Sequence, residues 1–264
     1  MAIYTIHGGH AAHGNKNCGA VGYCSESLVD RQIVAATKKW LEYAGHTVYD
    51  CSVDSGISAG NIIYKIKNKI NLYKGADVNI SIHLNAASKS KADGKVKGSE
   101  VLVYSTVERA AAVGNDILKE LKALGFTNRG IKKRTDLGIL KGITNGGDNV
   151  LVEVFFCDDK DDYDLFLKVG VDAIGKAIAQ GVIGKAIATS SMRAAKPVIK
   201  NGSSGTEAQK LQLNLNKVIN AGLVADGKFG SKSVAALKKW QSAAGLVADG
   251  VYGPASYEAM QRLL

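Results

Sequence analysis

The sequence predicts an α/β fold, a twisted and mostly parallel sheet flanked by helices, followed by a small all-α C-terminal domain. Short β-rich runs alternate with long helical runs from residue 1 to about residue 188. One short run, residues 149–156, is almost continuously apolar, which is typical of a strand buried on both faces of a parallel sheet. Near the C-terminus a short segment occurs twice, which indicates a small unit built by duplication.

The first elements alternate strand, helix, strand and helix. Residues 2–6 are the first expected strand, and residues 30–44 repeat apolar side chains at helical spacing until Gly45, a residue type that commonly ends helices. Residues 47–53 resume a strand. Residues 62–73 place lysines between regularly spaced isoleucines, so we expect an amphipathic helix there.

The following strand carries side chains of two kinds. In residues 78–84 the apolar side chains share one face, whereas Ser81 and His83 point to the other. The remaining expected elements of this domain are two further strands, residues 98–105 and 149–156, and two further helices, residues 107–124 and 162–181.

Composition divides the chain into three segments. Residues 1–188 form the α/β domain. Residues 189–205 are rich in small and polar types and hold one of only two prolines, a composition typical of linkers. Residues 206–264 contain the duplication, in which residues 222–230 recur as residues 245–253. Each copy is followed by an expected helix, residues 231–240 and 254–264.

The net charge of +10 implies attraction to a polyanion. Nucleic acid is not the expected partner, because the basic residues are dispersed and few aromatic side chains accompany them. Phosphate-bearing wall polymers and anionic lipid headgroups fit the charge equally well. No apolar run approaches the length of about 18 residues needed to span a bilayer, so we expect no membrane insertion.

The N-terminus lacks the basic start, apolar stretch and cleavage site of a secretory signal, so we expect no export by that route. The cysteines form no CxxC pair, which suits a reducing cytoplasm better than a disulfide framework. They are Cys18, Cys24, Cys51 and Cys157.

Four residues with metal-binding or acid–base side chains lie where expected strands meet loops. His10 follows the first strand, Glu26 lies in the expected loop before the first helix, and His83 lies near the end of its strand. Two histidines and one glutamate are a standard ligand set for catalytic zinc, which leaves one position for water. Glu153, inside an apolar strand, would then accept the proton of that water, so the set predicts hydrolysis.

Simpler interpretations exist for each of these residue types. Loop histidines such as His13 and His46 are usually surface residues, and His7 within the first strand is more often paired with a neighbour than bound to a metal. An acid in a run as apolar as residues 150–156 must be paired, protonated or functional, and a buried salt bridge is the alternative interpretation of Glu153.

Several motifs in a fixed order resemble a known family. The chain from about residue 2 to 187 is similar to the zinc-dependent N-acetylmuramoyl-L-alanine amidases of phage endolysins and bacterial autolysins. The motifs are Gly9-His10, Glu26, Ser81-Ile-His83-Leu-Asn85-Ala86, residues 97–104, Asn128-Arg-Gly130 and residues 152–158. The resemblance implies zinc ligands at His10, Glu26 and His83 and the catalytic acid/base at Glu153.

The loop before the first ligand departs from the family pattern. Many members have Asp-Pro-Gly-His where this chain has His7-Gly8-Gly9-His10, which puts the loop conformation and the role of His7 in question. The segment from about residue 205 resembles the small peptidoglycan-binding domain often fused to wall hydrolases. Its marker is the Asp-Gly-x-Phe/Tyr-Gly turn, present at residues 226–230 and 249–253.

The resemblance implies a peptidoglycan hydrolase that cuts between N-acetylmuramic acid and L-alanine of the stem peptide, in a Gram-positive wall. The missing export signal together with a wall substrate favours a phage endolysin, held in the host cytoplasm before its release to the cell wall. A bacterial autolysin of the same activity, a zinc peptidase cutting within the stem peptide and a non-catalytic wall-binding protein are the alternatives.

Overall fold

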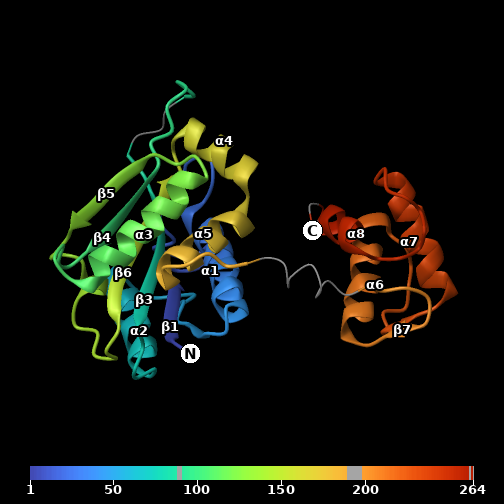
Figure 1. The fold of residues 1–264 in the computed structure, drawn as a ribbon, viewed down its shortest axis with the longest axis horizontal. Coiled ribbons are helices and arrows are strands. Elements are labelled where there is room, and N and C mark those ends of the chain that lie inside the picture. Colours follow the sequence, from blue (N-terminus) through green and yellow to red (C-terminus); the bar gives the residue numbers. More distant parts are fainter. Residues whose placement is uncertain (88–90, 189–197, 262, 264) are drawn as a thin grey trace. The chain divides into compact units, whose positions relative to one another are not determined.

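A computed structural model of the chain describes residues 1–87, 91–188, 198–261 and 263 (Figure 1). The chain divides into two compact units, Met1–Ile187 and Ala188–Leu264. No helix in the described parts is both long and apolar enough to cross a membrane.

The first unit is built on a six-stranded sheet of order β2-β1-β3-β6-β4-β5. Four of the five strand pairings are parallel, and only β4 runs antiparallel to its neighbour β6. The predicted mostly parallel sheet is therefore confirmed. Its strands are β1 (Ile3–Gly8), β2 (Thr47–Asp50), β3 (Val78–Asn85), β4 (Ser99–Val103), β5 (Asn128–Lys133) and β6 (Asp148–Phe156).

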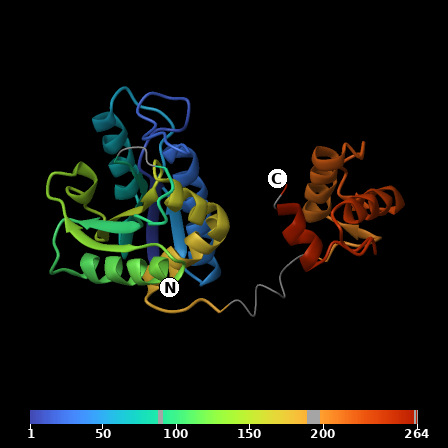
Figure 2. The same cartoon turned by 90° about the horizontal axis from the view of Figure 1, so that it is seen from above.

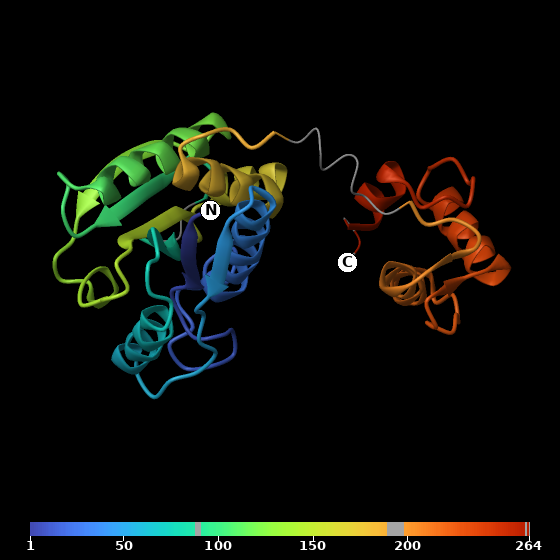
Figure 3. The ribbon, with the colours of Figure 1, turned by 60° about the horizontal axis from the view of Figure 1, so that its bottom comes forward.

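Helices cover both faces of this sheet. On one face α5 packs between α1 and α3, and α2 lies on the other face (Figures 2 and 3). The isoleucines of α2, with Ile139 and Leu140 of the short helix η1, pack on Leu102 and Leu151. The bounds are α1 (Glu26–Tyr43), α2 (Ala59–Asn71), α3 (Arg109–Ala123), η1 (Gly138–Leu140), α4 (Lys160–Val169) and α5 (Val171–Ile183).

The strand order reverses beside β1. The chain leaves β1 toward β2 through α1 and returns to β3 through α2, on the opposite face. Such a reversal opens a crevice at the carboxyl ends of the central strands, where ligands of open α/β sheets bind. The ends of β1 and β3 therefore frame the candidate site.

Two expected helices differ from the structure, and one strand was not expected. Helix α1 begins at Glu26, four residues earlier than expected, so Glu26 lies on the helix and not in a loop. The single helix expected over residues 162–181 is two helices, because Gly170 adopts a φ of 81° between them. Strand β5 was not predicted, since its residues are polar and lie at an edge of the sheet.

The second unit contains α6 (Thr206–Ile219), α7 (Ser231–Ala243) and α8 (Pro254–Gln261) with a two-stranded sheet of β7 (Ser203–Ser204) and β8 (Lys228–Phe229). Its core gathers Leu215, Phe229, Leu237 and Trp240, all essentially buried. Helix α6 was not predicted, because it precedes the duplicated turn that drew attention to this region.

The duplication extends to a buried hydrogen-bond network. In the first copy the Gln212 amide donates to Asp226 Oδ1, Lys228 O and Ser233 Oγ, while its oxygen accepts from Gly227 N. In the second copy Gln241 makes the same four bonds, with Asp249, Val251, Ser256 and Gly250 as partners. Each Asp-Gly turn is thus fixed to its unit by one buried glutamine.

Part of the segment expected as a linker belongs to the second unit. Ile199 forms a β-bridge with Tyr252, and Ser203–Ser204 is strand β7. Residues 189–197 of that segment lie outside the described residues.

We predict that Gln212→Leu destabilises the second unit by about 2 kcal/mol, because Gly227 N and its other partners lose a hydrogen bond in a buried site. Calorimetric unfolding of the full chain should show one transition shifted to lower temperature. Leu213→Gln is the matched control, since Leu213 is the next residue on α6 and is 54% exposed. Equal shifts in both variants would contradict the role given to Gln212.

Candidate metal centre

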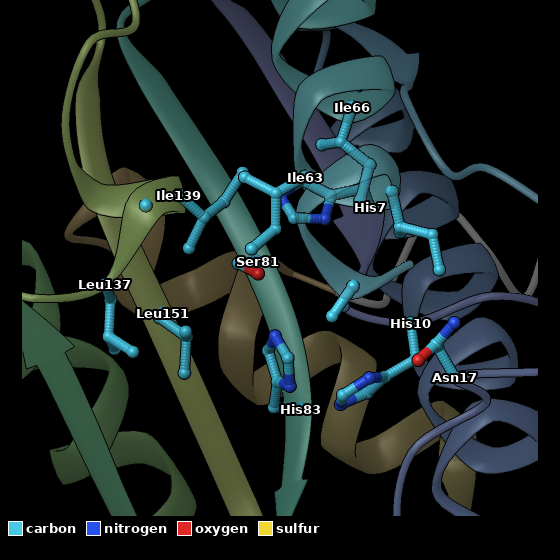
Figure 4. Close-up of a pocket in the computed structure, with 14 residues that line it drawn as sticks. His7, His10, Asn17, Ile63, Ile66, Ser81, His83, Leu137, Ile139 and Leu151 are labelled. Carbon is cyan, nitrogen blue, oxygen red and sulfur yellow. The ribbon is translucent and has the colours of Figure 1, made fainter. Parts of the chain in front are cut away.

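Three side chains from separate elements converge near the carboxyl ends of β1 and β3. The ligand atoms of His10, Glu26 and His83 lie within 4.8 Å of one another. Glu26 Oε1 lies 3.1 Å from His10 Nε2 and 3.1 Å from His83 Nδ1. His10 comes from the loop after β1 and His83 from β3 (Figure 4). Glu26 comes from the first turn of α1.

Glu26 is the buried member of the group, with 2% of its surface exposed. Ala20 N donates to Glu26 Oε2 and Leu84 N donates to Glu26 Oε1. Burial opposes the ionisation of Glu26, but its hydrogen bonds to His10 and His83 outweigh burial and hold its pKa well below the usual range. The carboxylate is therefore ionised at every pH at which the two imidazoles could bind a metal.

Two glycines are required for this convergence. A Cβ at Gly9 would lie 1.8 Å from Cε1 of the His83 ring. A Cβ at Gly19 would lie 2.5 Å from Glu26 Oε2, and Gly19 also has a φ of +80°. The backbone thus approaches the donor side chains more closely than any larger residue allows.

The donor set fits zinc in type, and the two separations from Glu26 Oε1 fit it in spacing. Tetrahedral zinc with bonds of roughly 2.0–2.1 Å places its ligand atoms roughly 3.3 Å apart, close to the two 3.1 Å separations from Glu26 Oε1. Two imidazoles and one carboxylate leave a fourth position for water or substrate. His10 is the more exposed histidine, with 31% of its side chain accessible against 14% for His83, so the set is open on that side.

Glu153 lies beside this group and is not one of its members. It is the register partner of His83 across the β3–β6 pairing. Its Oε2 is buried and accepts no hydrogen bond from any described residue. Burial raises the pKa of Glu153 to about 7, with the positive charge of His83 acting in the opposite direction. A carboxyl with such a pKa can take up and release a proton near neutral pH.

An open groove connects Glu153 with the three donors. It is lined on one side by His10, Glu26 and His83 and continues past Asn85 and Arg134. Arg134 forms two hydrogen bonds with Asp136, at 2.8 and 2.7 Å. The arrangement offers a metal site, a proton acceptor and room for an extended substrate along one surface.

The other histidines are elsewhere. His13 bonds to Ser25 Oγ, and His46 accepts from Ala2 N at the opposite end of β1. His7 is buried in β1, three residues before His10, and its Nδ1 lies 3.1 Å from Gly8 O. None of the three is in the group of ligand atoms.

Two acidic residues near the site were missed by sequence reasoning. Asp30 is fully buried on α1 and neither of its carboxylate oxygens has a hydrogen-bond partner among the described residues; burial raises its pKa to about 6. The sequence could have indicated Asp30, because it lies four residues after Glu26 and therefore on the same face of the helix.

Glu100 is the second of these acidic residues. It is the register partner of Glu153 on β4 and bonds to Arg129 and Asn85. Nothing in the sequence indicated that β4 would lie beside β6.

Comparison with known proteins agrees with this geometry. The catalytic domain of the CD27L endolysin targeting Clostridia difficile is 29% identical, with a TM-score of 0.62 over 71% of this chain and 100% of that one. An uncharacterized protein of Clostridium perfringens is 30% identical over 66% of this chain and 50% of its own length. The probable autolysin PH of Staphylococcus aureus is 30% identical over 67% of this chain and 38% of its own length. The chain thus spans half or less of the curated relatives it matches.

Two family matches cover the two units. Residues 204–260 match a putative peptidoglycan binding domain. Residues 10–184 match N-acetylmuramoyl-L-alanine amidase. Because that second match covers more than half of the sequence and contains the whole candidate site, the chain belongs to the N-acetylmuramoyl-L-alanine amidase family.

Proposed function

We propose that this protein is a zinc-dependent amidase, which hydrolyses the bond between N-acetylmuramic acid and the L-alanine of the peptidoglycan stem peptide. The observation that carries the proposal is the group of His10, Glu26 and His83, together with Glu153 as the register partner of His83 on the neighbouring strand. The first three would hold zinc and Glu153 would be the catalytic acid/base. The likeness to the CD27L endolysin domain supports this assignment.

The chemistry follows from the positions of these side chains. Zinc in a two-histidine, one-carboxylate set supplies Lewis acidity, which makes water nucleophilic near neutral pH. Glu153 accepts a proton from the attacking water and donates it to the nitrogen of the departing L-alanine. Its raised pKa suits both steps, since the carboxylate must bind the proton and then release it.

The second unit would hold the enzyme on its insoluble substrate. It matches a putative peptidoglycan binding domain. It carries ten Lys and Arg against four Asp and Glu, so most of the net positive charge of the chain lies there. Binding to peptidoglycan raises the local concentration of the catalytic unit, and anionic wall polymers would add a salt-sensitive attraction.

The biological role we infer is that of an endolysin acting on a Gram-positive wall after release from the host cytoplasm. The likeness to an endolysin catalytic domain supports it, as do relatives from Clostridium and Staphylococcus. The match to a probable autolysin supports the alternative role, a bacterial autolysin of the same activity.

The decisive experiment is chemical analysis of digested peptidoglycan. The zinc-loaded full chain should release new N-terminal L-alanine without new reducing sugar ends. Glu153→Gln should lower the rate by at least about a hundredfold, because general acid–base catalysis contributes that much or more. Its zinc content should match that of the unsubstituted protein.

A different product would change the assignment. New N-termini from another residue would make the protein a stem-peptide peptidase. No release by a protein that holds zinc and binds peptidoglycan would leave a wall-binding protein.

The pH profile should report on Glu153. Burial, together with the negative charges of Glu26 and Glu100, raises the pKa of Glu153 to about 7. A general base must be ionised, so kcat/KM should fall as pH decreases below about 7, which gives the profile an acid limb. The positive charge of bound zinc would move this acid limb to lower pH. Glu100→Gln removes one negative charge and should shift the limb downward. An acid limb that Glu100→Gln leaves in place would contradict the assignment of the limb to Glu153.

Gly9→Ala should weaken zinc binding by at least about tenfold, because the new Cβ would displace the His83 ring. Competition with a chromogenic chelator measures this affinity. Gly60→Ala is the matched control, since the nearest atom to a Cβ there is Ser58 Oγ, at an ordinary contact distance of 3.9 Å. Unchanged zinc affinity in Gly9→Ala would argue against His83 as a ligand.

A further inference from the structure

A separate cavity lies behind the candidate metal centre on the same face of the sheet. Its volume is about 200 Å³. It lies between the sheet and α2 and η1, and it shares His10, His83, Leu137 and Leu151 with the open groove (Figure 4). The cavity and the groove therefore meet beside the metal-binding side chains.

The strand register fixes how far the cavity floor lies from the site. His7, Ser81 and Leu151 are register partners on β1, β3 and β6, and all three line the cavity. His83 and Glu153 form the corresponding pair two residues further along the strands. Two residues of a strand span roughly 6.5 Å. A side chain attached next to a bond held at His83 would therefore reach this floor.

The lining is mostly apolar and excludes sugar. Ile62, Ile63 and Ile66 of α2 form one wall, and Leu137 and Ile139 form another. Against these two apolar walls a sugar ring would bury hydroxyl groups without partners, at a cost of about 1–3 kcal/mol for each one. The glycan side of the substrate must therefore lie in the open groove, which leaves the peptide side for the cavity.

One polar group in the cavity has no partner. Ser81 is 2% exposed, lines the cavity and has a buried Oγ with no hydrogen bond to any described residue. A buried hydroxyl without a partner is costly in free energy unless a ligand supplies the bond. The hydroxyl therefore favours an occupant with a polar atom at that position.

The volume of the cavity exceeds what the methyl side chain of alanine would fill. An engineered apolar cavity of about 150 Å³ holds benzene, so a cavity of about 200 Å³ is far larger than one methyl group. Alanine would leave most of it empty. Its volume therefore has room for a side chain larger than a methyl group.

We propose that this cavity receives the side chain of the residue whose amine is released, accepts residues larger than alanine there, and favours threonine over its isostere valine through Ser81. The proposal rests on the amidase function proposed above. Threonine and valine have nearly the same shape, so Ser81 Oγ would discriminate between them through one hydrogen bond.

The test uses soluble N-acetylmuramoyl peptides that differ only in the first residue, which is alanine, valine or threonine. Two quantities are measured with the full chain: kcat/KM of the zinc-loaded protein, and the dissociation constant for Glu153→Gln by calorimetry. We expect valine and threonine compounds to be cleaved within about tenfold of the alanine compound, with threonine ahead of valine.

Two variants probe the wall and the floor. Ile63→Trp fills the cavity and should lower kcat/KM for valine and threonine at least about tenfold more than for alanine. Tyr64→Phe is its control, because Tyr64 is the next residue on α2, is 64% exposed and does not line the cavity. Ser81→Ala should reduce the threonine-to-valine ratio by about fivefold to tenfold, both in kcat/KM and in affinity.

The outcomes separate this proposal from the amidase function. Cleavage of the alanine compound with a hundredfold or greater loss for valine and threonine would overturn the cavity assignment alone. So would equal effects of Ile63→Trp on all three compounds, or a threonine-to-valine ratio unchanged by Ser81→Ala. Failure to cleave even the alanine compound would overturn the amidase function instead.

Discussion

The buried carboxylate of Glu26 is the interaction on which the rest of the site depends. An ionised group with 2% exposure is stable only when hydrogen bonds and opposite charge replace its water. Here two backbone N–H groups, from Ala20 and Leu84, and the two imidazoles do so. These partners come from the loop before α1 and from β3, so the same contacts that satisfy the carboxylate also set the positions of His10 and His83.

The sequence predicted the residues of this site better than their arrangement. Glu153 could be found because it is an acid in an otherwise apolar strand, and His83 because it lies near the end of a strand, where metal-binding side chains of α/β sheets gather. Their pairing across β3 and β6 could not be found, since periodicity shows which face a side chain occupies but not which strand lies beside it. For the same reason the antiparallel placement of β4, and with it Glu100 beside Glu153, was outside the reach of sequence patterns.

The boundaries that were predicted wrongly have local causes. Glu26 was expected in a loop because the apolar repeat of α1 becomes clear only after Asp30, yet the helix already begins with Ser25 as its N-cap. Gly170 divides α4 from α5 by adopting a positive φ, which no apolar pattern reveals. Gln212 and Gln241 resemble ordinary polar residues of amphipathic helices, and only the fold shows that each is buried against an Asp-Gly turn.

On the face of the sheet below α2, two successive sets of register partners, here called rungs, differ in polarity and exposure. At the rung of His83 and Glu153 the side chains are ionisable and adjoin an open groove, whereas at the rung of Ser81 and Leu151 the surroundings are apolar and closed by α2 and η1. The parallel pairing of β3 with β6 holds Ser81 beside Leu151 and His83 beside Glu153, so neither pair can move without the other. A substrate bond held at the first rung must therefore present its neighbouring side chain to the second. The rise of the strand therefore sets the distance between the reacting bond and the cavity that receives the side chain beside it.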